Sequence, residues 1–276
     1  MSAQKLTKWL PSALKKFRTN RRQIDFTAHN VLGIEDLIQR EKPGKIHIEP
    51  MAIGQHHQAM QMLKEHYLSE HVLIRARGMD VLQDNALDEY LYSLLKQGNT
   101  ICAKTHDGTP VGICVNVVSS PADPKILKDY AHYRQDPHTK EFLNFVAKLQ
   151  ETLNLWDVFK VPKIFEIKML TVIPEYRRRG VATMLAESSN ELAETQGYDV
   201  VRMDCINPHD FKIAERLLFH CMAKFPLKAL RARNRIGHGD HYTPVGYVRV
   251  YVGARSRDHP DAELKQKRRE LESLVE

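Results

Sequence analysis

The stretch Met169-Leu-Thr-Val-Ile-Pro-Glu-Tyr-Arg-Arg-Arg-Gly-Val-Ala-Thr-Met-Leu185 decides how this chain folds. Apolar, β-favouring residues dominate positions 165–173, and Pro174 removes a ladder donor, so we expect a strand that ends there. Apolar side chains then recur at helical spacing over residues 180–192, and Gly197 marks the end of that helix. The stretch therefore predicts a buried strand, a basic turn and a helix.

The turn between these two elements carries Arg177, Arg178 and Arg179 directly before the start of the helix. The first N–H groups of a helix have no intrahelical partner, and beside fixed positive charges they suit an anion such as a pyrophosphate. The alternative is that the three arginines form an ordinary solvated face.

Arg177-x-x-Gly180-x-Ala182 resembles the acetyl-CoA signature, Gln/Arg-x-x-Gly-x-Gly/Ala, of the GNAT superfamily of N-acetyltransferases. Residues 170–177 are similar to the fourth strand of that superfamily. Other segments resemble its arylalkylamine N-acetyltransferase-like branch, typical of insects, and the resemblance covers about residues 45–254 and weakens after Phe211. These segments are Ile46-His-Ile-Glu-Pro50, Gly108-Thr-Pro-Val-Gly-Ile-Cys-Val-Asn116 and Tyr67-Leu-Ser-Glu-His-Val-Leu73, the last without the Pro usual in that branch.

Strands alternating with helices along the chain favour an α/β domain. We expect strands at 45–48, 100–104, 111–118, 200–205 and 246–254, and helices at 55–68, 84–96, 142–156 and 211–225. Asp107-Gly108 predicts a hairpin turn, whereas residues 119–140, with three prolines, are expected to form a long surface connection. The resemblance narrows the fold to a mixed, strongly twisted central sheet flanked by helices, with splayed fourth and fifth strands.

The resemblance implies acetyl-CoA as the co-substrate, bound in the cleft between the splayed strands. The strand residues Leu170, Thr171 and Val172 would meet the pantetheine arm, and a backbone N–H there, that of Leu170, would stabilise the oxyanion. The turn would hold the pyrophosphate through Arg177, Arg178, Arg179, Gly180, Val181 and Ala182.

An amine is mostly protonated near neutral pH and must lose a proton before it attacks a thioester. Glu49 occupies the Glu-Pro step that the resemblance assigns to the catalytic base, and Pro50 would fix the backbone after it. The alternative is a strand-end glutamate that faces water. Many members of the superfamily use a tyrosine as the general acid that protonates the departing CoA thiolate, and Leu218 stands at that position here. His209, His220 and Tyr176 are candidates to replace it. Alternatively, the thiolate leaves without an acid.

By analogy, residues 67–79 and 237–244 wall the amine pocket. Tyr67, His241 and Tyr242 are suited to stack on an aromatic amine, and Glu70 or Asp240 to attract a second cation. Pro50 and His209 are further substrate-site candidates. We therefore expect a small primary amine as the partner, whether an arylalkylamine, a polyamine or an agmatine-like compound. Two alternatives stay open, a peptide or protein amine in an open groove and a non-catalytic CoA-binding module.

The net charge of +7 belongs to the first 24 residues, which hold seven bases and no acid. The rest has 41 − 7 = 34 bases against 34 acids, so we expect no nucleic-acid partner. No apolar run approaches the ~20 residues of a transmembrane helix, and we expect a monomer. Four scattered cysteines indicate reduced core residues, and no spacing indicates a metal site.

We expect a basic N-terminal extension over residues 1–44, an N-acetyltransferase domain over 45–255 and a charged helical tail over 256–276. The acid-free, amphipathic N-terminus is typical of a mitochondrial transit peptide, but Pro11 interrupts its stripe and lysines are prominent among its charges. The preferred interpretation is the extension of a cytoplasmic enzyme.

Overall fold

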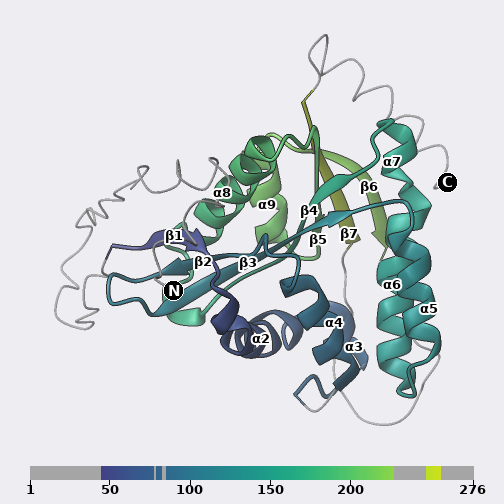
Figure 1. Ribbon diagram of the computed structural model, residues 1–276, viewed down its shortest axis with the longest axis horizontal. Helices are drawn as coiled ribbons and strands as arrows, with labels where there is room; N and C mark the ends of the chain where they lie inside the picture. Colours follow the sequence, from purple (N-terminus) through teal and green to yellow (C-terminus); the bar gives the residue numbers. More distant parts are fainter. Residues whose placement is uncertain (1–44, 78, 83–84, 227–246, 256–276) are drawn as a thin grey trace, which may run out of the picture.

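The computed structural model describes residues 45–77, 79–82, 85–226 and 247–255, and its sheet lies between layers of helices (Figure 1). The seven strands lie in the order β1-β2-β3-β4-β5-β7-β6. Their bounds are β1 His47–Pro50, β2 Ile101–Lys104, β3 Pro110–Ser119, β4 Ile164–Val172, β5 Val200–Cys205, β6 His220–Pro226 and β7 Tyr247–Ala254. The extensions predicted over 1–44 and 256–276 lie outside the described residues.

The predicted splay of the fourth and fifth strands is confirmed by the pairing of β4 with β5. These neighbours are parallel, and the other pairs in the sheet are antiparallel. The last rung that joins β4 to β5 pairs Ile167 with Met203. Beyond it β4 continues to Val172, paired with β3 alone among the described strands, so the sheet opens on that side of β4.

Two helices cover one face of the sheet, α8 (Val181–Thr195) and α9 (Pro208–Arg216). The opposite face and the end of the sheet are covered by a larger set (Figure 1). This set comprises η2 Ile53–Gln55, α2 His56–Leu63, η3 Lys64–Leu68, α3 Val72–Arg77, α4 Asn85–Leu95, α5 Asp123–His132, α6 Pro137–Leu153 and α7 Leu155–Val158. The short η4 (Pro174–Tyr176) links β4 to the turn before α8.

The packing of α8 on the sheet explains why a glycine stands in β3. A Cβ on Gly112 would lie 3.1 Å from Leu185 Cδ1 and 3.2 Å from the Thr171 carbonyl oxygen. Leu185 and Val181 are buried against this face, together with Val172. The close approach seats α8 beside the end of β4, where its N-terminus meets the opening of the sheet.

The predicted surface connection over residues 119–140 is wrong, because α5 and the start of α6 occupy most of it. Pro124 and Pro137 lie in the first turns of these helices, where a proline removes no intrahelical hydrogen bond. The predicted helix over 142–156 is present as the end of α6 and as α7. Asn154, with φ of 38°, separates the two.

The predicted helix over residues 211–225 is also wrong beyond Arg216. There α9 ends, and β6 follows as the edge strand beside β7. Leu218 makes the turn between them in the left-handed region, with φ of 61°, and is 82% exposed. Apolar residues at 214, 217, 218, 221 and 225 fit a helical period, but the long-range pairing with β7 decides the conformation.

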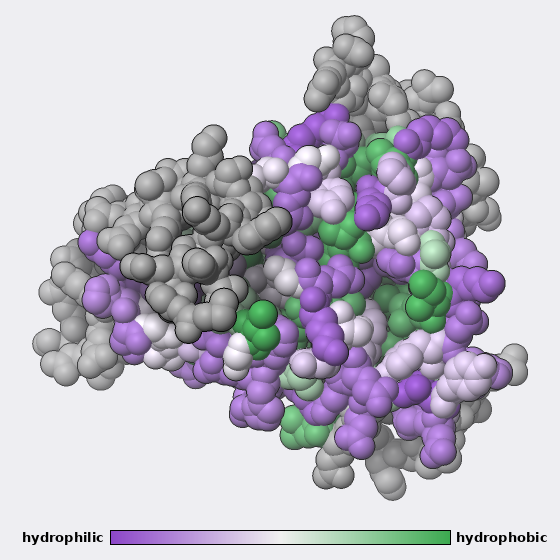
Figure 2. All heavy atoms as spheres, viewed as in Figure 1, coloured by the Kyte–Doolittle hydropathy of each residue, from purple (hydrophilic) through white to green (hydrophobic). Residues whose placement is uncertain are grey.

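Apolar side chains on the surface lie in small separate groups on the face drawn in Figure 2, which is mostly hydrophilic. The large exposed ones among the described residues are Ile53, Leu82, Tyr92, Ile126, Tyr133, Leu218 and Tyr247. None of the helices in the described ranges has the length and apolar character needed to cross a membrane. The four cysteines are free thiols, and Cys102, Cys114 and Cys205 are buried, in line with the predicted core positions.

Candidate active site

The turn between β4 and α8 presents a row of free backbone N–H groups. The N–H groups of residues 178–183 donate to no acceptor within the described part of the chain, whereas Met184 N–H already donates to the Gly180 carbonyl at 3.0 Å. Arg178 and Gly180 both have positive φ, 61° and 79°. A Cβ on Gly180 would meet nothing within 4 Å, so the space beside these amides is open. This geometry suits an anion.

The exposed edge of β4 lies beside this turn. Ile173 N–H donates to the Val111 carbonyl at 3.0 Å, which directs it towards β3. Successive amides of a strand alternate in direction, so Thr171 N–H also faces β3, and the N–H groups of Leu170 and Val172 face the opening. The edge of β4 therefore offers hydrogen-bonding groups in the direction in which β5 has departed.

The three arginines of the turn have different surroundings. Arg177 Nε donates to the Val172 carbonyl at 2.8 Å, and its Nη2 lies 2.8 Å from Glu70 Oε1. Arg179 lies over the ring of Tyr176, 5.0 Å from its centroid, and Arg178 is exposed. Arg177 thus braces the turn against β4 and the segment after η3, which leaves the backbone amides as the main anion-binding groups.

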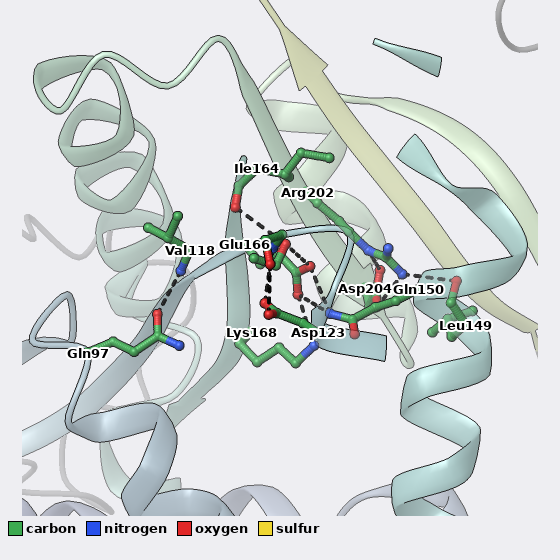
Figure 3. Close-up of polar contacts among 12 residues, drawn as sticks. Gln97, Val118, Asp123, Leu149, Gln150, Ile164, Glu166, Lys168, Arg202 and Asp204 are labelled. Carbon is green, nitrogen blue, oxygen red and sulfur yellow. Dashed lines mark hydrogen bonds and ion pairs between the residues drawn. The ribbon is translucent and has the colours of Figure 1, made fainter. Parts of the chain in front are cut away.

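On the other face of the sheet, charged side chains lie buried where β4 and β5 separate (Figure 3). Glu166 is 2% exposed, and its carboxylate lies 2.9 Å from Lys168 Nζ. The same carboxylate accepts hydrogen bonds from Ser119 Oγ at 2.6 Å and Gln150 Nε2 at 2.9 Å. Burial alone would raise the pKa of Glu166, but the neighbouring cations Lys168 and Arg202 and the hydrogen bonds from Ser119 and Lys168 lower this pKa to about 2.

The second charged pair of this region lies on β5. Arg202 binds both oxygens of Asp204, from Nε at 2.8 Å and from Nη2 at 2.9 Å (Figure 3). Arg202 Nη1 is buried without a hydrogen-bond partner among the described residues. Lys168 is also the residue at which β4 bulges, since the register with β3 passes from Met169 to Ile167. The bulge and both pairs thus coincide with the last rungs that join the strands.

Two tyrosines border the opening above this charged cluster. Tyr67, in η3, is held near β4 because Thr171 Oγ1 donates to the His66 carbonyl at 2.9 Å. Burial raises the pKa of Tyr67, and so do the nearby acids Asp210 and Asp204. Burial also raises the pKa of Tyr90 on α4. Tyr67, which is tied to the β4 side, is therefore close enough to carboxylates on the β5 side for their charge to act on it.

Behind Tyr67 lies a buried histidine that the sequence alone does not single out. His71 is 6% exposed, and its ring makes edge contacts with Tyr67 and Phe142, at centroid distances of 5.7 and 5.4 Å. Burial lowers its pKa to about 4, so the ring is neutral near pH 7. Its Nδ1 accepts a hydrogen bond from Leu73 N–H at 3.3 Å. These contacts give it a packing role.

Glu49, the predicted base, lies on β1, and its side chain is 42% exposed. Its carboxylate is 2.6 Å from Lys104 Nζ and 3.6 Å from His47 Nε2. The register carries Glu49 across β2 and β3 to Thr171 of β4. Three strand spacings amount to about 14 Å. Glu49 thus lies at the same level of the sheet as Thr171, beside the open edge of β4, but three strands away from it.

The other predicted site residues do not gather in one place. Pro50 and His209 are exposed, and His209 N–H takes part in the N-cap of α9. His241, predicted in the amine pocket, lies outside the described residues. The segment 67–79, predicted to wall the amine pocket, is helical at its start in η3 and again over α3.

Sequence reasoning missed the buried cluster of Glu166, Lys168, Arg202 and Asp204. A signal for it was present, because these charges alternate with apolar residues in two strands that otherwise read as buried. Buried charges of this kind are rare unless they are paired, so two such strands indicate that they lie side by side.

The sequence model of the acetyltransferase (GNAT) family matches residues 60–215. Among solved structures, a mosquito arylalkylamine N-acetyltransferase like 5b is similar over 76% of this chain and 100% of that chain, with 17% identity and a TM-score of 0.68. Arylalkylamine N-acetyltransferase 2 from Aedes aegypti gives 21% identity and a TM-score of 0.68, over 76% and 99% of the two chains.

The polyamine N-acetyltransferase of Drosophila melanogaster, which catalyses the formation of N-acetylagmatine, has 21% identity, a TM-score of 0.65 and coverage of 76% and 100%. At these identities the likeness is one of fold. It agrees with the splayed sheet and with the free amides before α8, and the family match spans both. This chain belongs to the GNAT family of acetyltransferases.

Proposed function

We propose that this protein transfers the acetyl group of acetyl-CoA to a small primary amine. The observation that carries the proposal is the row of free N–H groups at 178–183 beside the open edge of β4. A pyrophosphate has the charge and size to bind the row of N–H groups at 178–183. An extended arm that contains amides suits the open edge of β4. The family uses acetyl-CoA, whose two parts have these chemistries.

In this proposal acetyl-CoA supplies the acetyl thioester, and the chain binds and orients it. The amides of 178–183 hold the pyrophosphate, with Arg178 nearby. The edge of β4 binds the pantetheine arm, and the N–H of Leu170 points at the thioester oxygen as charge develops on it. No side chain is needed for that stabilisation, which agrees with the apolar sequence around Leu170.

The amine approaches from the face that carries η3, α4 and the buried charges. Glu49 acts as the base that removes the ammonium proton. Because it stands about 14 Å from β4, the proton reaches it through water. Lys104 and His47 hold the carboxylate on the acceptor face of the sheet.

A small amine is favoured over a peptide because η3 packs directly on β4. The hydrogen bond from Thr171 to His66 and the ring of Tyr67 occupy the side on which an open groove would run. Similar folds are found in proteins described as acting on arylalkylamines and on agmatine, which supports small amines as the class.

The proposal is tested by incubating the full chain with acetyl-CoA and tyramine, agmatine, spermidine or a peptide with a free N-terminus. Thiol release and the product mass are measured. We expect acetylation of one or more of the three small amines and at least tenfold slower reaction with the peptide. Preference for the peptide would overturn the substrate class, and CoA binding without transfer to any amine would leave the non-catalytic alternative.

A further inference from the structure

We propose that Asp210 is a second catalytic residue, which takes the proton from the attacking nitrogen and passes it to the departing CoA sulfur. The inference deepens the proposed amine acetyltransferase and rests on it. Asp210 follows β5 directly, in the first turn of α9, and so stands on the β5 side of the opening.

The placement of Asp210 follows from the residues on both sides of the opening. Tyr67 reaches in from η3, which is tied to β4 through Thr171 and His66. The Asp210 carboxylate is the charge with the largest effect on the Tyr67 phenol, and Asp204 and Cys205 of β5 also affect it. Tyr67 thus stands on the β4 side of the opening and Asp210 on the β5 side, close enough for the carboxylate to act on the phenol, and the thioester is proposed to lie between the two strands.

The hydrogen bonds of Asp210 fix its carboxylate at the start of α9. Oδ2 accepts from Asn207 Nδ2 at 2.7 Å and from Ile206 N–H at 3.5 Å. The backbone N–H of Asn207 also acts on the carboxylate, and the side chain is partly buried. The carboxylate is thus oriented mainly through Oδ2.

The surroundings of Asp210 also suit a group that both accepts and donates a proton. Burial raises its pKa to about 7, against the effect of its hydrogen bonds to Ile206 and Asn207. No cation of the described residues forms an ion pair with it. Its charge acts on Tyr67 of η3 and on Cys205 of β5. Cys205 is also affected by Asp204 of β5, Cys221 of β6 and Arg249 of β7.

The proposed step balances as follows. The bound amine has lost its ammonium proton to solvent through Glu49, and its lone pair forms the C–N bond to the thioester carbon. The nitrogen then gives a proton to the Asp210 carboxylate, and the C–S bond breaks with its electron pair going to sulfur. Asp210 returns that proton to the thiolate, so the products are the amide, free CoA thiol and the unchanged carboxylate.

The first test is Asp210→Asn in the full chain, assayed with acetyl-CoA and whichever of tyramine, agmatine and spermidine the unmodified protein acetylates fastest. We expect kcat to fall by about 10²–10⁴-fold with little change in CoA affinity. The unmodified protein should gain activity as pH rises through about 7, because the carboxylate must be ionised to accept the proton. Asp210→Asn should lose that rise.

Asn207→Ala is the matched control, because it disturbs the same cap without removing the carboxylate. Asn207 Oδ1 accepts from His209 and Asp210 N–H, so this change lowers stability by about 1 kcal/mol. It should keep the rise in activity but move it to higher pH, because the hydrogen bond from Asn207 Nδ2 that lowers the pKa of Asp210 is lost. If Asp210→Asn keeps normal kcat, or if both variants lose the rise equally, the role is structural and the proposal is overturned.

A second measurement does not depend on transfer to an amine. The carboxyl ¹³C signal of Asp210 is titrated in labelled protein with CoA and with desulfo-CoA, which lacks the sulfur. A titration midpoint that differs between the two places Asp210 at the sulfur, even if no amine is acetylated and the proposed function fails. Identical midpoints would overturn the placement of Asp210 whether or not transfer occurs.

Discussion

The candidate sites on the two faces of the opened sheet differ in the groups that form them, backbone amides on one face and side chains on the other. On the α8 face, the candidate cofactor site consists of backbone groups from β4 and the turn at 178–183. On the opposite face, the candidate acceptor site consists of side chains from η3, α4, β4 and β5, and Asp210 at the start of α9 stands at the opening between the strands. One face is thus contiguous in sequence, whereas the other is assembled from segments up to about 140 residues apart.

Because of this difference, the two faces should respond differently to amino-acid substitutions. Most substitutions of a side chain leave the backbone N–H of that residue in place. The arginines of the turn are largely exposed, and Arg177 bonds the Val172 carbonyl. The acceptor face depends on buried charges that are stable only as a set, because removing one partner leaves the other without compensation in a low-dielectric region. Substitutions should therefore affect binding on the first face and folding on the second.

The largest effect is expected from Glu166→Gln. The change removes the counter-charge of Lys168 and leaves Arg202 with Asp204 alone. Breaking a buried pair in this way costs about 3–5 kcal/mol of unfolding free energy. Chemical denaturation followed by circular dichroism measures it.

Two controls sharpen this prediction. The double variant Glu166→Gln with Lys168→Met removes both charges and should recover more than half of the loss. Asp157→Asn breaks the ion pair with Lys160, in which the side chains are 69% and 78% exposed, and should cost less than about 1 kcal/mol. If Glu166→Gln costs no more than Asp157→Asn, the buried cluster does not stabilise the acceptor face.

The same contrast explains how much was predictable from sequence. The strand at 165–173, the turn and the helix from Gly180 were predicted within about one residue, because local periodicity, Pro174 and Gly180 determine them. The splay and the family followed from the resemblance of this stretch and are confirmed. The residues of the candidate cofactor site are consecutive in the chain, so the sequence pattern that predicts it is also consecutive.

The acceptor face was missed because its residues meet only through long-range pairing. Tyr67 and Asp210 are neighbours only after η3 packs on β4 and β5 diverges, and no local spacing records that. The helix predicted over residues 211–225 is wrong at His220–Pro226 for the same reason, since pairing with β7 imposes a strand there. The signature's own tyrosine position, Leu218, lies exposed in the turn before this strand.

A second prediction acts on the cofactor face through Gly180→Asp. The variant introduces a side chain at φ of 79° and a negative charge beside the free amides, so CoA affinity should fall at least about tenfold. Calorimetric titration of CoA measures it. Gly98→Asp is the matched control, because φ is 75° there and a Cβ also meets nothing within 4 Å. Equal CoA affinity in Gly180→Asp and the unmodified protein would remove the pyrophosphate site.

The smallest effect is expected where the two faces touch, at the ion pair of Glu70 with Arg177. Both side chains are partly exposed, 49% and 37%, so the pair contributes less than about 1 kcal/mol to stability. Glu70→Gln removes a negative charge near the proposed pyrophosphate and frees one edge of Arg177, whose Nε stays on the Val172 carbonyl. CoA should therefore bind slightly more tightly, by up to about fivefold, and less so at high salt.

Glu65→Gln tests whether this gain comes from position or from charge alone. Glu65 lies in the same segment, and its carboxylate accepts from Gln61 rather than from the turn. CoA affinity should change less in this variant than in Glu70→Gln when both are titrated at low and high salt. If Glu70→Gln instead weakened CoA binding tenfold or abolished transfer, the ion pair would couple the two faces, and the division between a backbone-built cofactor site and a side-chain-built acceptor site would not hold.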